Sequence, residues 1–344
     1  MSASDNSRTG PSSRLVIGSI VAAVWTLWLL GLLLGDRAGL FADNWFMSVT
    51  MAFGSFIAGA TSEGGGAVAF PVMTLFFGIE PATARDFSLM IQAVGMSAAG
   101  ATILLTRIPV ERHAIVWASA GGALGMVLGL EFLSGLLPPP YVKMLFTSTW
   151  LSFAVGLYLI NRYHEREVHE EITNFLPRHA VLLFGTGIIG GLISSQTGSG
   201  LDITVFALLV LRLRINEKIA TPTSVVLMGI NSVVGFLWKD VQGAGMASAA
   251  WGYWWVCVPI VVVGAPFGAW FIKFRSRLFV ATLLYVSIGV QFVSALLIIP
   301  MTTQLVGFSA AIFVAGSLLF RWMAARGVRR LEWLSDRFPR PEAT

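Results

Sequence analysis

Most of this chain consists of apolar runs long enough to cross a lipid bilayer, and this feature limits its fold more than any other. A helix rises about 1.5 Å per residue, so roughly 20 apolar residues span the hydrocarbon core. Because backbone polar groups in lipid must be hydrogen-bonded internally, we expect an all-α polytopic membrane protein. The full-length runs are Leu15–Leu34, Thr83–Thr106, His113–Ser134, Val142–Ile160, Glu217–Trp238, Ala250–Phe271, Leu278–Ile299 and Leu305–Trp322.

Composition and charge placement agree with a multi-pass membrane protein. Only 12% of the 344 residues are charged and 56% are hydrophobic, whereas soluble domains average about 25% charged residues. The net charge of +5 does not indicate a nucleic-acid partner, because the basic residues lie in short loops and at the termini. With both termini in the cytoplasm, 19 of the 23 Lys and Arg residues fall on the inner side, as the positive-inside rule requires. We therefore expect an inner-membrane protein with cytoplasmic N- and C-termini.

Two further apolar stretches, Asn44–Gly78 and Arg178–Arg212, are each interrupted by a glycine-rich break. Glycine is unfavourable inside a helix, so each stretch is expected to hold a longer arm, a break and a shorter arm. The shorter arms, Ala67–Gly78 and Leu201–Arg212, have 12 residues each, which is roughly 18 Å of helix and too short to span comfortably. Each stretch is therefore predicted to form a re-entrant helical hairpin that returns to its starting side. If its two arms instead crossed the membrane, the rest of the chain would keep the same orientation, so charge placement does not distinguish the two.

The two breaks are followed by similar segments in the same order, which indicates an internal repeat. Each half then holds a hairpin and three crossings. An odd number of crossings inverts the second half, so two inverted repeats with an extra helix at each end are predicted. The expected divisions are an N-terminal tail and first helix, the first repeat, a charged cytoplasmic linker, the second repeat, and a last helix with a basic tail, at residues 1–43, 44–160, 161–177, 178–299 and 300–344.

The breaks are the candidate binding site. The first N–H groups of each short arm have no partner within the helix and carry the positive end of its dipole, and glycine lets an anion approach them closely. Two such helix ends meeting near the bilayer midplane could hold an anion. The competing interpretation is that the glycines only permit close helix packing. The candidate residues are Ser62, Glu63, Gly64, Gly65, Gly66, Gln196, Thr197, Gly198, Ser199 and Gly200.

Polar side chains on the next helix of each half could complete the site, and these are Ser88, Gln92, Ser224 and Asn231. Ordinary hydrogen bonds between helices would explain the same residues. Intramembrane acids are often functional, so Glu63 is a candidate for carrying a coupling proton, while capping of the short arm is the structural alternative. Asp202 could cap the second short arm or pair with a base. Arg85 and Asp86 are expected to form a local ion pair.

Other chemistries find little support in the sequence. The single cysteine, Cys257, excludes an intrachain disulfide and a cysteine-based metal site. A metal site in the His- and Glu-containing linker at 164–171 is conceivable, but we expect a solvated connector there. The chain contains no Walker A loop and no potassium-filter sequence. We therefore expect no enzyme activity, no metal and no cofactor.

The chain resembles the TauE/SafE sulfite exporter family. The resemblance is carried by the triple glycine followed by Pro71 and by Ala84–Ser88, with weaker copies at Gly198–Gly200 and Ala220–Ser224, and it extends from about Asn44 to Ile299. It implies a secondary transporter for a small sulfur-containing anion such as sulfite, thiosulfate or an organosulfonate. The second break departs from the family pattern, since Gln196-Thr197-Gly198-Ser199-Gly200 stands where a glycine run is expected, and Glu63 precedes the first run.

The expected function is therefore export of a sulfur oxyanion or organosulfonate by alternating access, with a proton as the candidate coupling ion. Export rather than uptake follows only from the resemblance. The alternatives are an anion channel and a membrane protein without transport activity. The expected partners are the small anion and the lipid bilayer, and a homodimer is left open.

Overall fold

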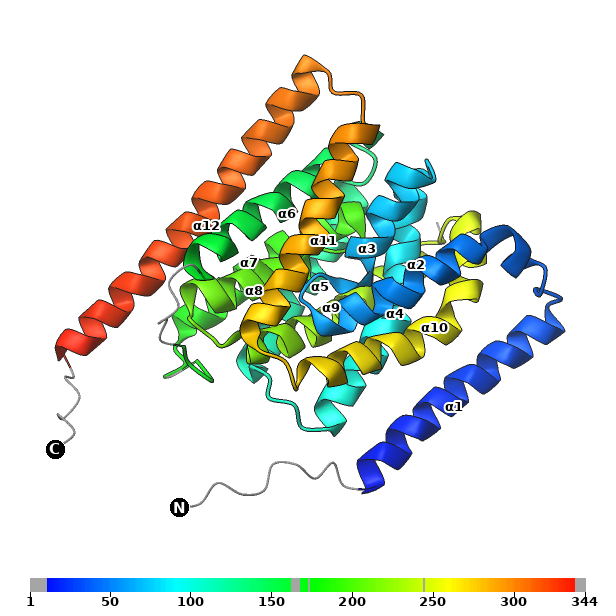
Figure 1. Ribbon diagram of the computed structural model, residues 1–344, viewed down its shortest axis with the longest axis horizontal. Coiled ribbons are helices and arrows are strands. Elements are labelled where there is room, and N and C mark those ends of the chain that lie inside the picture. The colour runs from blue at the N-terminus through cyan, green and yellow to red at the C-terminus, as the bar shows by residue number, and fades with distance from the viewer. Residues whose placement is uncertain (1–10, 162–167, 173, 244, 338–344) are drawn as a thin grey trace.

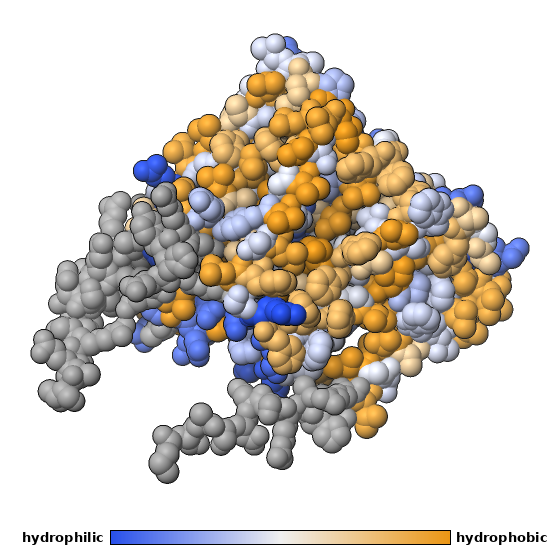
Figure 2. Space-filling view, in the orientation of Figure 1, coloured by the Kyte–Doolittle hydropathy of each residue, from blue (hydrophilic) through white to orange (hydrophobic). Residues whose placement is uncertain are grey.

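A computed structural model describes residues 11–161, 168–172, 174–243 and 245–337, and this part of the chain is all-helical. Nine of its helices are long and apolar enough to cross a membrane. Large hydrophobic side chains remain exposed on the outside, among them Leu27, Val181 and Leu297, which suits contact with lipid. Figure 2 shows hydrophobic residues over the body of the molecule on this face, with hydrophilic residues gathered toward its edges. The chain is a multi-pass membrane protein.

The helices form one bundle with α1 and α12 at its periphery (Figure 1). Two short π-helical segments, η1 and η2, follow α3 and α8. In chain order the elements are α1 (Pro11–Leu34), α2 (Leu40–Ala60), α3 (Gly64–Pro71), η1 (Val72–Phe76), α4 (Pro81–Leu105), α5 (Arg112–Phe132), α6 (Pro139–Asn161), α7 (Pro177–Thr197), α8 (Leu201–Ala207), η2 (Leu208–Arg212), α9 (Glu217–Val241), α10 (Ser248–Ile272), α11 (Arg277–Ile298) and α12 (Thr303–Arg337).

The eight predicted runs are all helices. Their ends lie within a few residues of those expected, except that α12 continues to Arg337, beyond the predicted end at Trp322. Two further features concern the broken stretches. The ninth helix of spanning length is α7, the longer arm of the second broken stretch. The first short arm begins at Gly64 and not at Ala67, so the prediction that the triple glycine lies in the break is wrong. The break is Thr61–Glu63, and the glycines form the first turn of α3, where backbone hydrogen bonds within the helix are missing in any case.

The two halves of the chain show the same sequence of elements. Both longer arms, α2 and α7, have 21 residues, both short arms end in a five-residue π-helix, and α4 and α9 have 25 residues each. The two halves pack against each other. Helix α5 of the first half lies along α7 of the second, and α10 of the second half lies along α2 of the first. At the first broken stretch the chain turns back, because Phe46 near its start and Phe77 just after η1 have ring centroids 4.1 Å apart.

Small residues allow these exchanged contacts. A Cβ at Gly121 or Gly125 would collide with the backbone of α7, and one at Gly59 or Gly268 would collide with the backbone of its partner in the α2–α10 pair. In lipid, helix association depends on such close packing, since there is no hydrophobic driving force between helices. The small-residue clusters thus bring the two broken stretches together in the centre of the bundle.

A buried ion-pair network joins four helices near one end of the bundle. Asp86 on α4 accepts two hydrogen bonds from its neighbour Arg85, at 2.9 and 3.1 Å, and one from Lys239 on α9 at 2.5 Å. Its Oδ2 also accepts from the backbone N–H of Ala247, at the N-cap of α10, and Arg85 donates to Ser134 just after α5. The expected Arg85–Asp86 pair is present, and Lys239 extends it.

Replacing Asp86 with asparagine is expected to destabilise the protein by about 3 kcal/mol, because two partly buried cations lose their shared carboxylate. Thermal unfolding of the purified protein in detergent would measure this effect. Asp240→Asn is the matched control, since Asp240 lies beside Lys239 in the sequence but is exposed. Equal melting temperatures for Asp86→Asn and Asp240→Asn would show that the network contributes little.

The described part of the linker is attached to the bundle. Its His169 exchanges backbone hydrogen bonds with Arg214 and Asn216, and the buried Glu111 side chain accepts from the backbone N–H of Ile172 at 2.8 Å. Glu170 and Glu171 are exposed, as a solvated connector requires, whereas His169 and Ile172 attach the segment to the bundle. No group of three or more metal-binding side chains occurs among the described residues, and His164, Glu165, Arg166 and Glu167 lie outside them.

Candidate functional site

The two breaks touch each other in the core of the bundle. The Ser199 hydroxyl, in the second break, donates to the backbone carbonyl of Glu63 in the first break at 3.0 Å. From α4, the Gln92 amide donates to the carbonyl of Gly198 at 2.7 Å and to that of Ser88 at 2.9 Å. Segments 136 and 106 residues apart in sequence therefore meet at one buried point.

Gly64 lies at this meeting point, and both its backbone conformation and the small space around its Cα favour glycine. Its φ of +67° lies in the left-handed region, where a side chain is strained. A Cβ there would collide with a carboxylate oxygen of Asp202 and would lie 2.6 Å from Oε1 of Gln92. Any other residue is strained at this backbone position and would require the Asp202 and Gln92 side chains to shift.

The next two glycines differ in their surroundings. A Cβ on Gly65 would make only ordinary contacts, the nearest at 3.5 Å, whereas one on Gly66 would lie 2.6 Å from the Gln92 amide nitrogen and 3.0 Å from the Cβ of Ser88. All three glycines stand at the N-terminus of α3, where the N–H groups lack helical partners and the helix dipole is positive. This end of α3 has the chemistry of an anion-binding site.

Glu63 precedes these glycines and is completely buried. Its side chain makes no capping hydrogen bond to α3, so the capping alternative is wrong. Instead its Oε2 accepts from the Ser287 hydroxyl on α11 at 2.7 Å, while Oε1 has no partner. Gln291, one turn further along α11, donates to the Ser287 oxygen at 3.1 Å.

Sequence reasoning did not identify Ser287 and Gln291. The signal that could have found them is their spacing of four residues, which places two polar side chains on one face of the apolar helix α11. A face of that kind in a membrane helix is expected to meet another polar group of the protein.

At the second break, the side chain of Asp202 accepts hydrogen bonds from backbone N–H groups at the start of α8. This fully buried carboxylate accepts from the N–H groups of Gly200 and Ile203, both at 3.0 Å. Its Oδ2 also lies 3.1 Å from the Ser199 hydroxyl, whose single proton is shared with the Glu63 carbonyl. Asp202 therefore satisfies the helix end at α8, as the capping alternative stated. The expectation that both helix ends are open to an anion is wrong, since the positive end of α8 already has a negative partner.

The remaining candidate residues lie at various distances from the contact between the breaks. The Gln196 amide turns toward Ser195 and the carbonyl of Gly129 on α5, Thr197 donates to the carbonyl of Ser199, and Ser224 donates to the carbonyl of Thr221 on its own helix. Asn231 is buried near Gly122, and neither of its amide atoms has a partner. The structure brings together Ser62, Glu63, Gly64, Gly65, Gly66, Ser88, Gln92, Gly198, Ser199 and Gly200.

Buried polar atoms without partners gather at the first break. They are Ser62 Oγ, Glu63 Oε1 and Gln92 Oε1. Such atoms are costly in a protein interior unless something binds them. Between Gly65, Gln92 and the apolar residues Met51, Ile91 and Val261 the structure leaves a cavity of only about 10 Å³, which is about the size of a single water. This cavity is too small for an anion, and the Ser199–Glu63 hydrogen bond keeps the two breaks in contact in this conformation.

Comparison with known proteins gives one match. The family model described as "Sulfite exporter TauE/SafE" matches residues 46–290, from early in α2 to the middle of α11. No curated protein and no solved structure matches the chain. The matched region contains both breaks, the Asp86 network and all of the site residues that the sequence predicts, and it ends just before Gln291.

Proposed function

The chain belongs to the TauE/SafE family of sulfite exporters, and from this premise we propose that it is a secondary transporter that moves a small sulfur oxyanion or organosulfonate across the inner membrane by alternating access. The observation that carries this proposal is the direct contact between the two breaks, through Ser199 and the Glu63 carbonyl, in the centre of the bundle. Secondary transporters of several folds bind substrate at such interrupted helices between two repeats.

We further propose that each broken stretch is a re-entrant hairpin and that residues 44–160 and 178–299 are inverted repeats. The equal lengths of corresponding helices support this arrangement, as does the exchange of contacts between α5–α7 and α10–α2. The close approach of Phe46 and Phe77 supports the return of the first hairpin to its starting side. Both termini lie in the cytoplasm in this topology.

The proposed anion site is the N-terminus of α3. The N–H groups of Gly64, Gly65 and Gly66 would bind the oxyanion, and the Ser62 hydroxyl would add a donor. Because the second break is in direct contact with the first through Ser199 and the Glu63 carbonyl, binding requires the second break to move away from the first. Separation of Ser199 from Glu63 would thus accompany the change between closed and open states.

The coupling ion in this proposal is a proton on Glu63. An ionised carboxylate next to a bound anion is unfavourable, so the anion and the proton favour each other's binding. A doubly charged oxyanion carrying one proton still has a net negative charge. The inside-negative membrane potential then drives it outward, by about 2.3 kcal/mol per charge at 100 mV.

Flux into proteoliposomes tests the proposal. Purified protein is reconstituted, and uptake of labelled sulfite, thiosulfate, sulfoacetate and taurine is followed with an imposed proton gradient, an imposed potential or neither. The transporter is expected to accumulate at least one of these anions above its external concentration. An anion channel would only equalise concentrations under a pH gradient, and the absence of any flux would contradict transport altogether.

A further inference from the structure

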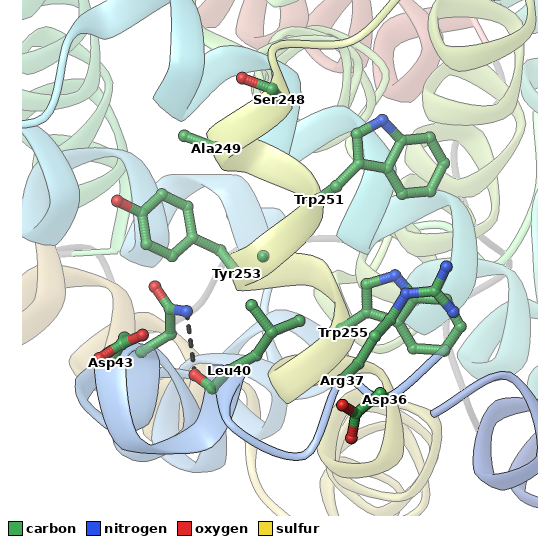
Figure 3. Close-up of a pocket in the computed structure, with 11 residues that line it drawn as sticks. Asp36, Arg37, Leu40, Asp43, Ser248, Ala249, Trp251, Tyr253 and Trp255 are labelled. Atoms are coloured by element: carbon green, nitrogen blue, oxygen red, sulfur yellow. Dashed lines mark hydrogen bonds between the residues drawn. The ribbon is translucent and has the colours of Figure 1, made fainter. Parts of the chain in front are cut away.

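A hollow away from the paired breaks lies where the connection between α1 and α2 faces the start of α10. Its volume is about 860 Å³ (Figure 3). Asp36 and Arg37 line it from the connection, Asp43 from the first turn of α2, and Tyr253 and Trp255 from α10. Figure 3 shows the Arg37 side chain lying over Trp255, with Asp43 on the other side of Leu40. Charged and aromatic groups at the ends of membrane helices are typical of the bilayer interface.

An apolar groove of about 430 Å³ runs from this hollow along α1. Val24 and Trp28 line it from α1, Val94 and Ala98 from α4, and Val258 from α10. Trp255 lines both the groove and the hollow. The Trp28 indole N–H donates to the carbonyl of Trp255 at 2.8 Å, which fixes α1 at this point. A polar hollow and an apolar groove thus lie on either side of Trp255, and together they match the polarity of a phospholipid head group and acyl chain.

We propose that the hollow and the groove together bind one phospholipid with a primary ammonium head group, of the phosphatidylethanolamine class. The acyl chain occupies the groove, the phosphate lies beside Arg37, and the ammonium group lies beside Asp36 or Asp43. The Arg37 guanidinium is held 4.5 Å from the centre of the Trp255 ring and donates one hydrogen bond to the carbonyl of Gly31. A guanidinium has five N–H donors, so others remain for a phosphate.

The balance of charge selects the head group. Two carboxylates and one guanidinium line the hollow, so a lipid with a net negative charge is disfavoured and a zwitterion is matched. A primary ammonium group donates charge-assisted hydrogen bonds to carboxylates, which a quaternary choline cannot do. The site depends on α1, which lies outside the region that the family model matches. It is therefore separate from the proposed anion site.

Native mass spectrometry of the full-length protein in detergent tests this site. The protein is titrated with phosphatidylethanolamine, phosphatidylglycerol and phosphatidylcholine that carry the same acyl chains. The wild type is expected to bind phosphatidylethanolamine about tenfold more tightly than the other two, as one charge-assisted hydrogen bond to a carboxylate implies. The double variant Asp36→Asn/Asp43→Asn should lose this preference. Glu80→Gln, which removes an exposed carboxylate outside the hollow, should keep it.

Two further results distinguish binding of the head group in the hollow from binding of the acyl chain in the groove. Ala98→Trp fills the groove and should weaken all three lipids, because the acyl chain is excluded. Equal affinities of the wild type for the three lipids would overturn the proposal, and so would an unchanged preference in the double variant or unchanged affinities in Ala98→Trp. Displacement of the lipid by millimolar sulfoacetate would instead assign the hollow to a solute path and would also overturn it.

Discussion

Alanine at position 64 is expected to abolish transport, although the substitution adds only one methyl group. The φ of +67° makes the alanine conformation strained by about 2 kcal/mol. The new Cβ would also push on Asp202 and on Gln92, whose amide holds the carbonyl of Gly198. Both effects distort the backbone at the N-terminus of α3, so its N–H groups are no longer placed to bind the anion. Anion flux in proteoliposomes, normalised to reconstituted protein, measures the loss.

Two other glycine substitutions control for this result. Gly39→Ala places a methyl group in open space before α2 and should leave flux unchanged. Gly65→Ala makes only ordinary contacts, so its melting temperature should stay near that of the wild type, while Gly64→Ala melts lower. Wild-type flux in Gly64→Ala would contradict the arrangement of the breaks described here. A loss of folding in all three variants would contradict the site-specific explanation, because alanine has a higher helix propensity than glycine and Gly39→Ala meets open space.

Replacing Glu63 with glutamine is expected to uncouple transport from the proton gradient. Glutamine keeps the shape of the side chain and an oxygen that can accept from Ser287, but it cannot release or bind a proton at neutral pH. Exchange of labelled for unlabelled substrate should therefore continue, whereas accumulation driven by a pH gradient should disappear. Flux measured at several external pH values in both modes distinguishes the two effects.

Ser287→Ala serves as the comparison for Glu63→Gln. It removes the hydroxyl that donates to Glu63 but leaves the carboxyl group, so accumulation should persist with a shifted pH profile. A wild-type pH profile in Glu63→Gln would remove the proton from the proposal and leave a transporter driven by membrane potential alone. Loss of exchange together with accumulation would assign Glu63 to substrate binding or folding.

The fold was largely predictable because the bilayer permits few solutions. Length and apolar composition gave all eight full-length helices, since a membrane helix must satisfy its backbone internally whatever its neighbours are. The start of α3 was not predictable from propensity. Triple glycine disfavours a helix in isolation, but the crowded contacts at Gly64 and Gly66 leave no room for side chains, and tertiary packing determined the outcome.

The candidate site was predictable in its location but only partly in its contacts. The paired breaks indicated that Gly64–Gly66 and Ser199 meet, and they do. Side-chain directions in the second break could not be read from spacing, so Gln196 was expected at the centre although it faces α5. The role of Ser287 was missed because α11 is far away in sequence, and only packing brings it to Glu63.

A cryo-electron microscopy map of the protein with sulfoacetate tests the central claim most directly. The claim is that the N-terminus of α3 binds the anion when the two breaks separate. We expect density for the sulfonate about 3 Å from the N–H groups of Gly65 and Gly66, and a Ser199–Glu63 distance well beyond the present 3.0 Å. A sulfonate bound elsewhere, with this contact intact, would contradict the account.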